Sequence, residues 1–165
     1  MQVDWGKNAM IVATIVGFGK LQLRHLVLDY NGTLALDGAL RTGVSDAMRL
    51  LSQAVRIHVL TGDTFGRARK QLAGLACTLK VLAPDDQALA KRKYVAELGP
   101  DQTVCVGNGR NDRFMLADAA LGIAVVQEEG AAVEALMAAK IVCPSILSAL
   151  ELLMQPVRLA ATLRS

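Results

Sequence analysis

The chain has 165 residues, of which 53% are hydrophobic, 20% charged and only 4% aromatic. This composition excludes a disordered chain, and the length predicts one domain over residues 1–165 with an aliphatic core. The net charge is +3 and no dense cluster of Lys and Arg appears, so nucleic acid is not expected as a partner.

Membrane and secretion signals are weak in this sequence. The apolar run 9–16 is far shorter than the roughly 20 residues of a membrane span. It also lacks the basic start of a signal peptide. Cys77, Cys105 and Cys143 are odd in number and show no metal-ligand spacing, so buried thiols in a cytoplasmic protein are expected.

Short apolar runs alternate with helical stretches along the chain. Runs 11–16 and 21–23 flank a Gly-rich turn and predict an N-terminal β-hairpin. Later runs are continuous, as in strands buried on both faces. These predicted strands are 26–28, 57–60, 79–82, 104–106, 121–126 and 141–142. The predicted helices between and after them are 45–54, 64–75, 86–98, 112–119, 131–138 and 145–154, the last ending near Pro156.

This alternation predicts an α/β fold: a doubly wound, Rossmann-like parallel sheet with helices on both faces. Ligands of such sheets bind at the carboxyl ends of the strands. Polar residues follow three of the predicted strands, at 29–34, 61–63 and 107–112. Each group alone could be a turn or a helix cap. Their joint placement after buried strands favours a functional site.

These three segments resemble the motifs of a known superfamily. Asp29-x-Asn31-Gly32-Thr33-Leu34 looks like the first motif of the haloacid dehalogenase (HAD) superfamily. Thr61-Gly62-Asp63 looks like its second motif, and Gly-Asn-Gly-Arg-Asn-Asp at 107–112 its fourth. Within the superfamily, the residues of these three motifs are most similar to those of the phosphorylation domain of P-type ATPases. The chain as a whole resembles the small, soluble, P-type-ATPase-like branch, over about residues 11–164.

The resemblance implies phosphoryl chemistry. Asp29 would be the nucleophile and become an aspartyl phosphate. Thr61 and Gly62 would hold phosphate oxygens, and Lys91 would neutralise the transferring phosphoryl group. Lys93 could do the same by position, so the choice between the two lysines stays open. The implied activity is a Mg²⁺-dependent phosphohydrolase.

The resemblance also implies a magnesium site, with hard oxygen ligands. Asp29, the carbonyl oxygen of Asn31 and Asp112 would hold the ion, with Asn108 beside it. Two positions depart from the phosphatases of the superfamily, which usually carry aspartates where this chain has Asn31 and Asn108. Asn31 cannot act as a general acid or base, so slow turnover and weak metal binding are expected.

The two Asn positions keep other functions open. A phosphate- or nucleotide-sensing module without turnover is one alternative. A regulatory partner of a P-type ATPase is another, suggested by the motif spelling. The side chain of Tyr30 could reach the mouth of the site or pack behind it, and His25 and His58 are interpreted as structural.

The spacing between motifs leaves no room for a cap domain, either between 34 and 45 or between 64 and 91. An open site suits a phosphorylated small molecule or a phosphoprotein, and it also suits a homo-oligomer whose subunits cover one another. The apolar tail 152–163 is expected to pack on the edge of the sheet or on a partner chain.

Overall fold

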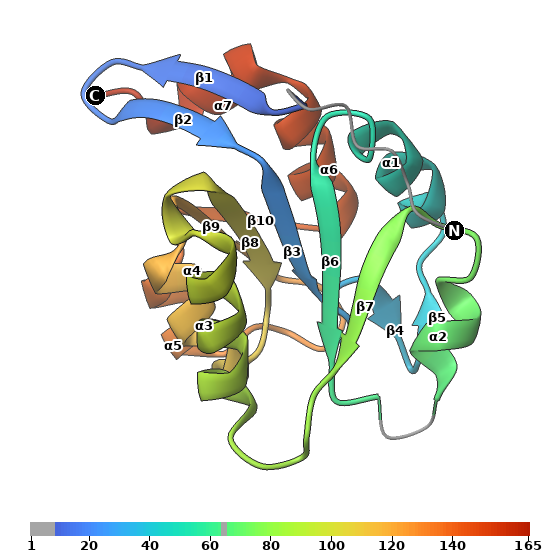
Figure 1. Ribbon diagram of the computed structural model, residues 1–165. Helices are drawn as coiled ribbons and strands as arrows, with labels where there is room; N and C mark the ends of the chain where they lie inside the picture. Colours follow the sequence, from blue (N-terminus) through green and yellow to red (C-terminus); the bar gives the residue numbers. More distant parts are fainter. Residues whose placement is uncertain (1–8, 64–65) are drawn as a thin grey trace.

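A parallel six-stranded sheet runs through the middle of the computed structural model, which describes residues 9–63 and 66–165 (Figure 1). Its strand order is β10-β9-β8-β3-β6-β7, and all neighbouring strands are parallel. The strands are β3 (His25–Asp29), β6 (Arg56–Thr61), β7 (Cys77–Val81), β8 (Thr103–Gly107), β9 (Leu121–Val125) and β10 (Ile141–Cys143). The chain winds outward from β3 in one direction, then returns to β8 on the other side of β3. The carboxyl ends of β3 and β8 therefore meet at a topological switch point, where ligands of such folds bind.

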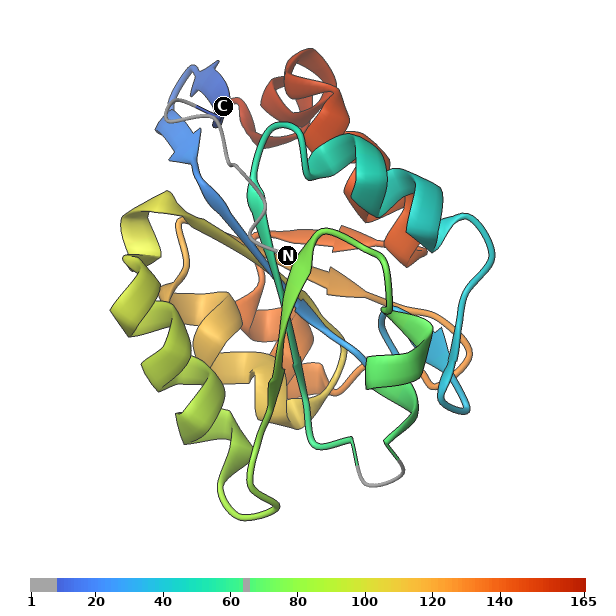
Figure 2. The same ribbon diagram turned by 45° about the vertical axis from the view of Figure 1, so that its right-hand side comes forward.

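Helices cover both faces of this sheet, as the sequence predicts (Figures 1 and 2). One face is covered by α1 (Val44–Leu51) and α6 (Ile146–Met154), while α7 (Pro156–Leu163) packs on α6 and on the N-terminal hairpin. The other face is covered by α3 (Gln87–Leu98), α4 (Arg113–Asp118) and α5 (Val133–Ala138). Two 3-10 turns, Pro100–Gln102 and Arg110–Asp112, complete the connections.

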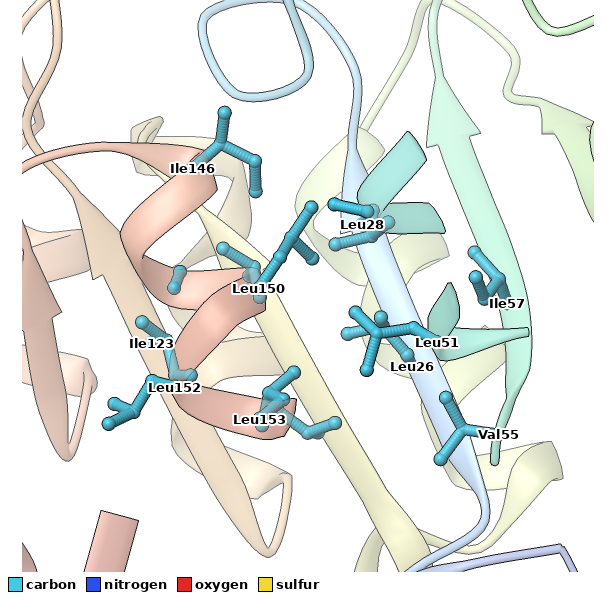
Figure 3. Packing of buried hydrophobic residues seen from close by; sticks show 14 of the residues in the cluster. Leu26, Leu28, Leu51, Val55, Ile57, Ile123, Ile146, Leu150, Leu152 and Leu153 are labelled. Carbon is cyan, nitrogen blue, oxygen red and sulfur yellow. The ribbon is translucent and has the colours of Figure 1, made fainter. Parts of the chain in front are cut away.

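The central strand β3 divides the core in two. Leu26 and Leu28 pack into a cluster with α1 and α6, which includes Leu51 and Leu150 (Figure 3). Val27, between them, faces the other cluster, under α3 and α4. Successive side chains of a strand point to opposite faces, so a strand covered on both sides needs the continuous apolar run found here. This packing fixes β3 and with it the position of Asp29 at its end.

The predicted N-terminal hairpin is confirmed and forms a sheet of its own. β1 (Ile11–Ile15) and β2 (Gly19–Leu23) pair antiparallel, with Ile11 opposite Leu23. The C-terminal tail packs on this hairpin through α7, and the Ser165 N–H donates to the Val16 carbonyl at 3.2 Å. Helix α6 ends at Met154 as predicted, but Pro156 begins a further helix that the sequence analysis did not anticipate. Proline suits the first turn of a helix, where its missing N–H costs nothing.

Other differences from prediction lie near the carboxyl edge of the sheet. A short hairpin of β4 (Ala35–Leu36) and β5 (Ala39–Leu40), not predicted, follows β3. Helix α2 (Arg67–Gln71) is shorter than the predicted 64–75, because Gly66 adopts a left-handed conformation at its start. The predicted start at Thr64 lies outside the described residues.

A cap domain would have to lie between residues 34 and 45 or between residues 64 and 91. The described residues there form the β4–β5 hairpin, α2, β7 and the ends of neighbouring helices, with no cap domain, as predicted. No single helix among residues 9–63 and 66–165 is long and apolar enough to cross a membrane. Only α6 and α7 taken together reach the required length and composition, and they bend by 106° between them.

Candidate active site

The three polar segments after the strands meet around one cavity of about 280 Å³. Asp29 lies at the end of β3, Thr61 at the end of β6, and Asn108 directly after β8. The residues that line the cavity are Asp29, Asn31, Thr61, Gly62, Asp63, Gln87, Asn108, Gly109, Asn111 and Glu129. Five of the seven predicted site residues are therefore among its walls. The other two, Lys91 and Asp112, are buried beside Asp29.

Lys91 joins two acidic residues of the site. Its Nζ donates hydrogen bonds of 2.6 Å to Asp29 Oδ1 and to Asp112 Oδ1, and the side chain is 1% exposed. Burial alone would lower the pKa of this ammonium, but the two carboxylates outweigh it and raise the pKa above the ordinary value. Lys93 is exposed and lines a separate groove with Lys80 and Tyr94. Of the two candidate lysines, only Lys91 reaches Asp29.

Asp112 is fully buried, and both of its carboxylate oxygens accept hydrogen bonds. Its Oδ1 binds Lys91, and its Oδ2 accepts the backbone N–H groups of Asn108 and Gly109 at 3.0 and 2.8 Å. Burial and the nearby charge of Asp29 raise the pKa of Asp112 to about 6, against the opposing effect of Lys91. Asp112 therefore holds the Lys91 ammonium in position and fixes the backbone at the start of the 107–112 loop.

Asp29 is oriented by hydrogen bonds to both of its oxygens. Oδ1 accepts from Lys91, and Oδ2 accepts from Thr33 Oγ1 at 3.0 Å. The same hydroxyl of Thr33 lies 3.3 Å from Asn108 Oδ1. A carboxylate fixed in this way at the edge of a cavity is well placed to attack a bound electrophile, because little reorganisation is needed.

The loop after β6 forms the opposite wall. Thr61 Oγ1 accepts the Asp63 N–H at 3.0 Å, which leaves its hydroxyl proton free for a ligand in the cavity. A Cβ at Gly62 would lie 2.5 Å from Gln87 Nε2, so the end of the Gln87 side chain lies directly against this loop. Gln87 in turn accepts a hydrogen bond from Asn111 Nδ2 at 3.1 Å.

Tyr30 packs away from the cavity that contains Asp29. Its ring is 1% exposed, and its hydroxyl donates to the Gly38 carbonyl at 3.0 Å. It lines a second cavity, next to the first, under the β4–β5 hairpin.

No protein-family model matches this chain. The uncharacterized protein MJ0073 of Methanocaldococcus jannaschii is 38% identical over 82 residues, which are 47% of this chain and 88% of that protein. The chain belongs to the family of MJ0073. Because MJ0073 is itself uncharacterized, this membership names no activity.

Solved structures place the MJ0073-like chain in a known fold. The 3-deoxy-D-manno-octulosonate 8-phosphate phosphatase of Moraxella catarrhalis, solved with magnesium, phosphate and KDO, aligns with a TM-score of 0.68. The identity is 14%, over 81% of this chain and 87% of that one. The fold is thus the Rossmann-like fold of the HAD phosphatases.

A second likeness has higher sequence identity. A zinc-transporting PIB-type ATPase in its E2.Pi state aligns with 30% identity and a TM-score of 0.55, over 75% of this chain. The alignment spans only 20% of that transporter, so the likeness concerns one part of it.

The cavity is lined by oxygen donors of the kind that Mg²⁺ accepts. Asp29 offers a carboxylate, and Asn31 and Asn108 offer amide or carbonyl oxygens, which are ligands that Mg²⁺ accepts. The described residues contain no group of three or more His, Cys, Asp or Glu side chains able to hold a metal. The predicted direct contact of Asp112 with the metal stays a prediction, and both of its oxygens are already engaged.

Several residues of the site were missed in the sequence analysis. Gln87, Asn111 and Glu129 line the cavity with Asp29, and Thr33 donates a hydrogen bond to Asp29. Thr33 lies within the first motif, and Asn111 within the fourth. Glu129 follows β9, whose carboxyl end lies at the same edge of the sheet. This position in the sequence indicates the edge at which Glu129 lies, although not the residues that it approaches.

Proposed function

We propose that this chain is a Mg²⁺-dependent phosphohydrolase that forms an aspartyl phosphate on Asp29. One observation supports this above the others: Asp29 lies at the wall of a polar cavity and is hydrogen-bonded to a buried lysine that is shared with Asp112. The fold of the HAD phosphatases and the likeness to part of a zinc-transporting PIB-type ATPase in its E2.Pi state agree with this function.

In the proposed first step, an Asp29 oxygen attacks the phosphorus of the substrate and the bond to the leaving group breaks. The ammonium of Lys91 stays beside the attacking carboxylate and balances the charge that gathers on the phosphoryl oxygens. The Thr61 hydroxyl and the Gly62 N–H, on the opposite wall, donate to those oxygens. Asp29, Asn31 and Asn108 would hold a Mg²⁺ ion, which would supply further positive charge for the phosphoryl oxygens.

In the second step, water releases phosphate and regenerates Asp29. Asn31 occupies the position where the superfamily usually has an aspartate that acts as general acid and base. The Asn31 amide does not ionise, so it can play neither role. We therefore expect a slow second step and a long-lived aspartyl phosphate. The substrate class, a phosphorylated small molecule or a phosphoprotein, follows from the open site.

The test is release of phosphate from acetyl phosphate, with Mg²⁺ and with EDTA, together with trapping of an acid-stable, hydroxylamine-labile phosphoprotein. Asp29→Asn should abolish both signals. Asp101→Asn is a matched control, because Asp101 is exposed at the opposite end of β8 and loses the same charge. Absence of turnover and of phosphoprotein in the parent would contradict the proposal. Tight binding of phosphate without either signal would support a sensing module instead.

A further inference from the structure

The second cavity, of about 350 Å³, adjoins the cavity that holds Asp29. The two share three lining residues, Asn31, Asp63 and Glu129. The second cavity offers room next to Asp29 for the rest of a substrate whose phosphoryl group is bound there. Groups at the junction are thus the ones that can reach the leaving group and, after it departs, the incoming water.

The proposed second step needs a proton acceptor at this junction. Three carboxylates line the cavity at Asp29: Asp29 itself, Asp63 and Glu129. Asp29 bears the phosphoryl group. Asp63 Oδ1 accepts the Ala68 N–H at 3.3 Å, so that this carboxylate caps the start of α2. Within residues 9–63 and 66–165, Glu129 has neither a hydrogen bond nor an ion pair. It is the carboxylate available for proton transfer.

The side chain of Glu129 reaches over the loop of the nucleophile. A Cβ added to Gly32 would lie 2.6 Å from Glu129 Oε2 and equally 2.6 Å from Asn108 Nδ2. The Glu129 carboxylate and the Asn108 amide therefore converge on the same point above Gly32. Asn108 is linked through the Thr33 hydroxyl to Asp29. Glu129 thus lies above the loop of the nucleophile and lines both cavities together with Asn31.

The turn that bears Glu129 is held firmly in place. The Gly130 N–H donates to the Gln127 carbonyl at 2.8 Å and closes the turn. Gln127 Nε2 donates to the carbonyls of Gly32 and Thr33, both at 3.0 Å, which joins the turn to the loop after Asp29. Asn108 Nδ2 donates to the Gly130 carbonyl at 3.0 Å. The backbone of the turn is therefore fixed against the loop that follows Asp29.

From this geometry we infer that Glu129 is the general base for hydrolysis of the aspartyl phosphate. Its carboxylate accepts a proton from water while the water oxygen bonds to phosphorus. The bond between phosphorus and the Asp29 oxygen breaks, Asp29 leaves as a carboxylate, and phosphate is released with the proton returned to solvent from Glu129. The inference rests on the proposed function, because it requires an aspartyl phosphate on Asp29.

Glu128, the neighbouring residue, gives a matched control. Its carboxylate points the other way and forms an ion pair with Arg41 at 2.7 Å, outside the cavity with Asp29. Glu128→Gln removes the same charge one residue away. It breaks an exposed pair that contributes little to stability.

The experiment is a single-turnover assay of the parent, E129Q and E128Q with acetyl phosphate and Mg²⁺. Acetyl phosphate has a good leaving group, so the first step needs no acid and the second step is isolated. E129Q should form the phosphoprotein at a rate within a few-fold of the parent. Its phosphoprotein should then decay about 10²–10⁴-fold more slowly, the usual contribution of a general base. E128Q should form and lose phosphate like the parent.

Two results would overturn the inference while leaving the proposed function intact. One is equal decay of the E129Q and parent phosphoproteins. The other is a parallel loss of phosphorylation rate and Mg²⁺ affinity in E129Q, because that pattern belongs to a metal ligand. If the parent forms no phosphoprotein, the proposed function itself has failed, and Asp29→Asn will be indistinguishable from the parent.

Discussion

Lys91 Nζ lies 2.6 Å from Asp112 Oδ1, and both side chains are at most 1% exposed. With Asp29, which is also 2.6 Å from Lys91, this makes one buried cation between two buried carboxylates. Removing one partner of such a group leaves charge uncompensated in a medium that solvates it poorly. The ammonium that we propose neutralises the phosphoryl group thus also links the ends of β3 and of the 107–112 loop.

Lys91→Met should destabilise the fold and abolish phosphorylation. The loss of the ammonium leaves Asp29 and Asp112 facing one another, and breaking a buried ion pair typically costs about 3–5 kcal/mol. Urea unfolding measures the change in free energy, and trapping measures the phosphoprotein. Lys93→Met is the matched control and should change both by little, because Lys93 is exposed and lies away from the site. Equal effects of the two substitutions would contradict the assigned role of Lys91.

The sequence was sufficient to predict the sheet because burial on both faces leaves a readable pattern. In β3, Leu26 and Leu28 enter one half of the core and Val27 the other, so the run is continuous. The places of Asp29, Thr61 and Asn108 at one edge then follow from the parallel topology. Pro156 was less informative, since proline both ends one helix and begins the next.

Contacts between distant residues could not be predicted in the same way. Lys91 and Lys93 are two residues apart and so point in nearly opposite directions from α3. Only the packing of that helix decides which one faces Asp29. Glu129 reaches the site because a turn is fixed by Gln127, whose partners Gly32 and Thr33 are more than 90 positions away. No local pattern encodes such a contact.

His58 should make stability depend on pH. Its Nε2 lies 3.1 Å from His25 Nδ1, and its Nδ1 lies 2.9 Å from the Tyr94 hydroxyl. Burial, with the charges of His25 and Arg56, lowers the pKa of His58 from 6.5 to about 4. The unfolded chain therefore binds a proton at a higher pH than the folded chain does. The free energy of unfolding should fall as the pH drops from about 6.5 to about 4, by a few kcal/mol at most.

His58→Gln is the variant that checks this prediction. Glutamine keeps hydrogen-bonding groups but does not titrate, so the variant should be less stable at neutral pH and its stability should change less between pH 6.5 and 4. Urea unfolding at a series of pH values gives both curves. Parallel curves for parent and variant would show that His58 is not the group responsible.

Asn108→Asp should strengthen magnesium binding. Asn108 is 7% exposed and lines the cavity with Asp29, so the substitution adds a second carboxylate at the proposed metal position. The substitution also removes the hydrogen bond from Asn108 Nδ2 to the Gly130 carbonyl, which should lower the free energy of unfolding by about 1 kcal/mol. Titration calorimetry should show a lower Kd for Mg²⁺ than in the parent. Asn111→Asp adds the same charge elsewhere on the cavity wall, and a similar gain in that variant would indicate a general effect of charge instead of a ligand.

Asn31→Asp should raise steady-state turnover, and the gain should depend on the leaving group. Asn31 lies at the junction of the two cavities, where a carboxylic acid could protonate the departing oxygen. General acid catalysis contributes typically about 10²–10⁴-fold. For alkyl phosphates, whose leaving groups need a proton, both steps can gain, whereas for acetyl phosphate only the hydrolysis of the aspartyl phosphate can gain, so the increase should be largest for alkyl phosphates. Phosphate release from both substrates, by parent and variant, measures the difference.

Deamidation is the main control for this comparison, since Asn31-Gly32 and Asn108-Gly109 are both Asn-Gly pairs. An aged sample of the parent could contain some aspartate at position 31 and hide the gain. Peptide mass analysis before each assay establishes that Asn31 is intact. If intact parent and Asn31→Asp then hydrolyse alkyl phosphates at the same rate, the missing acid does not limit this site. Leaving-group departure would in that case depend on another group at the junction, where Glu129 and Asp63 are the remaining carboxylates.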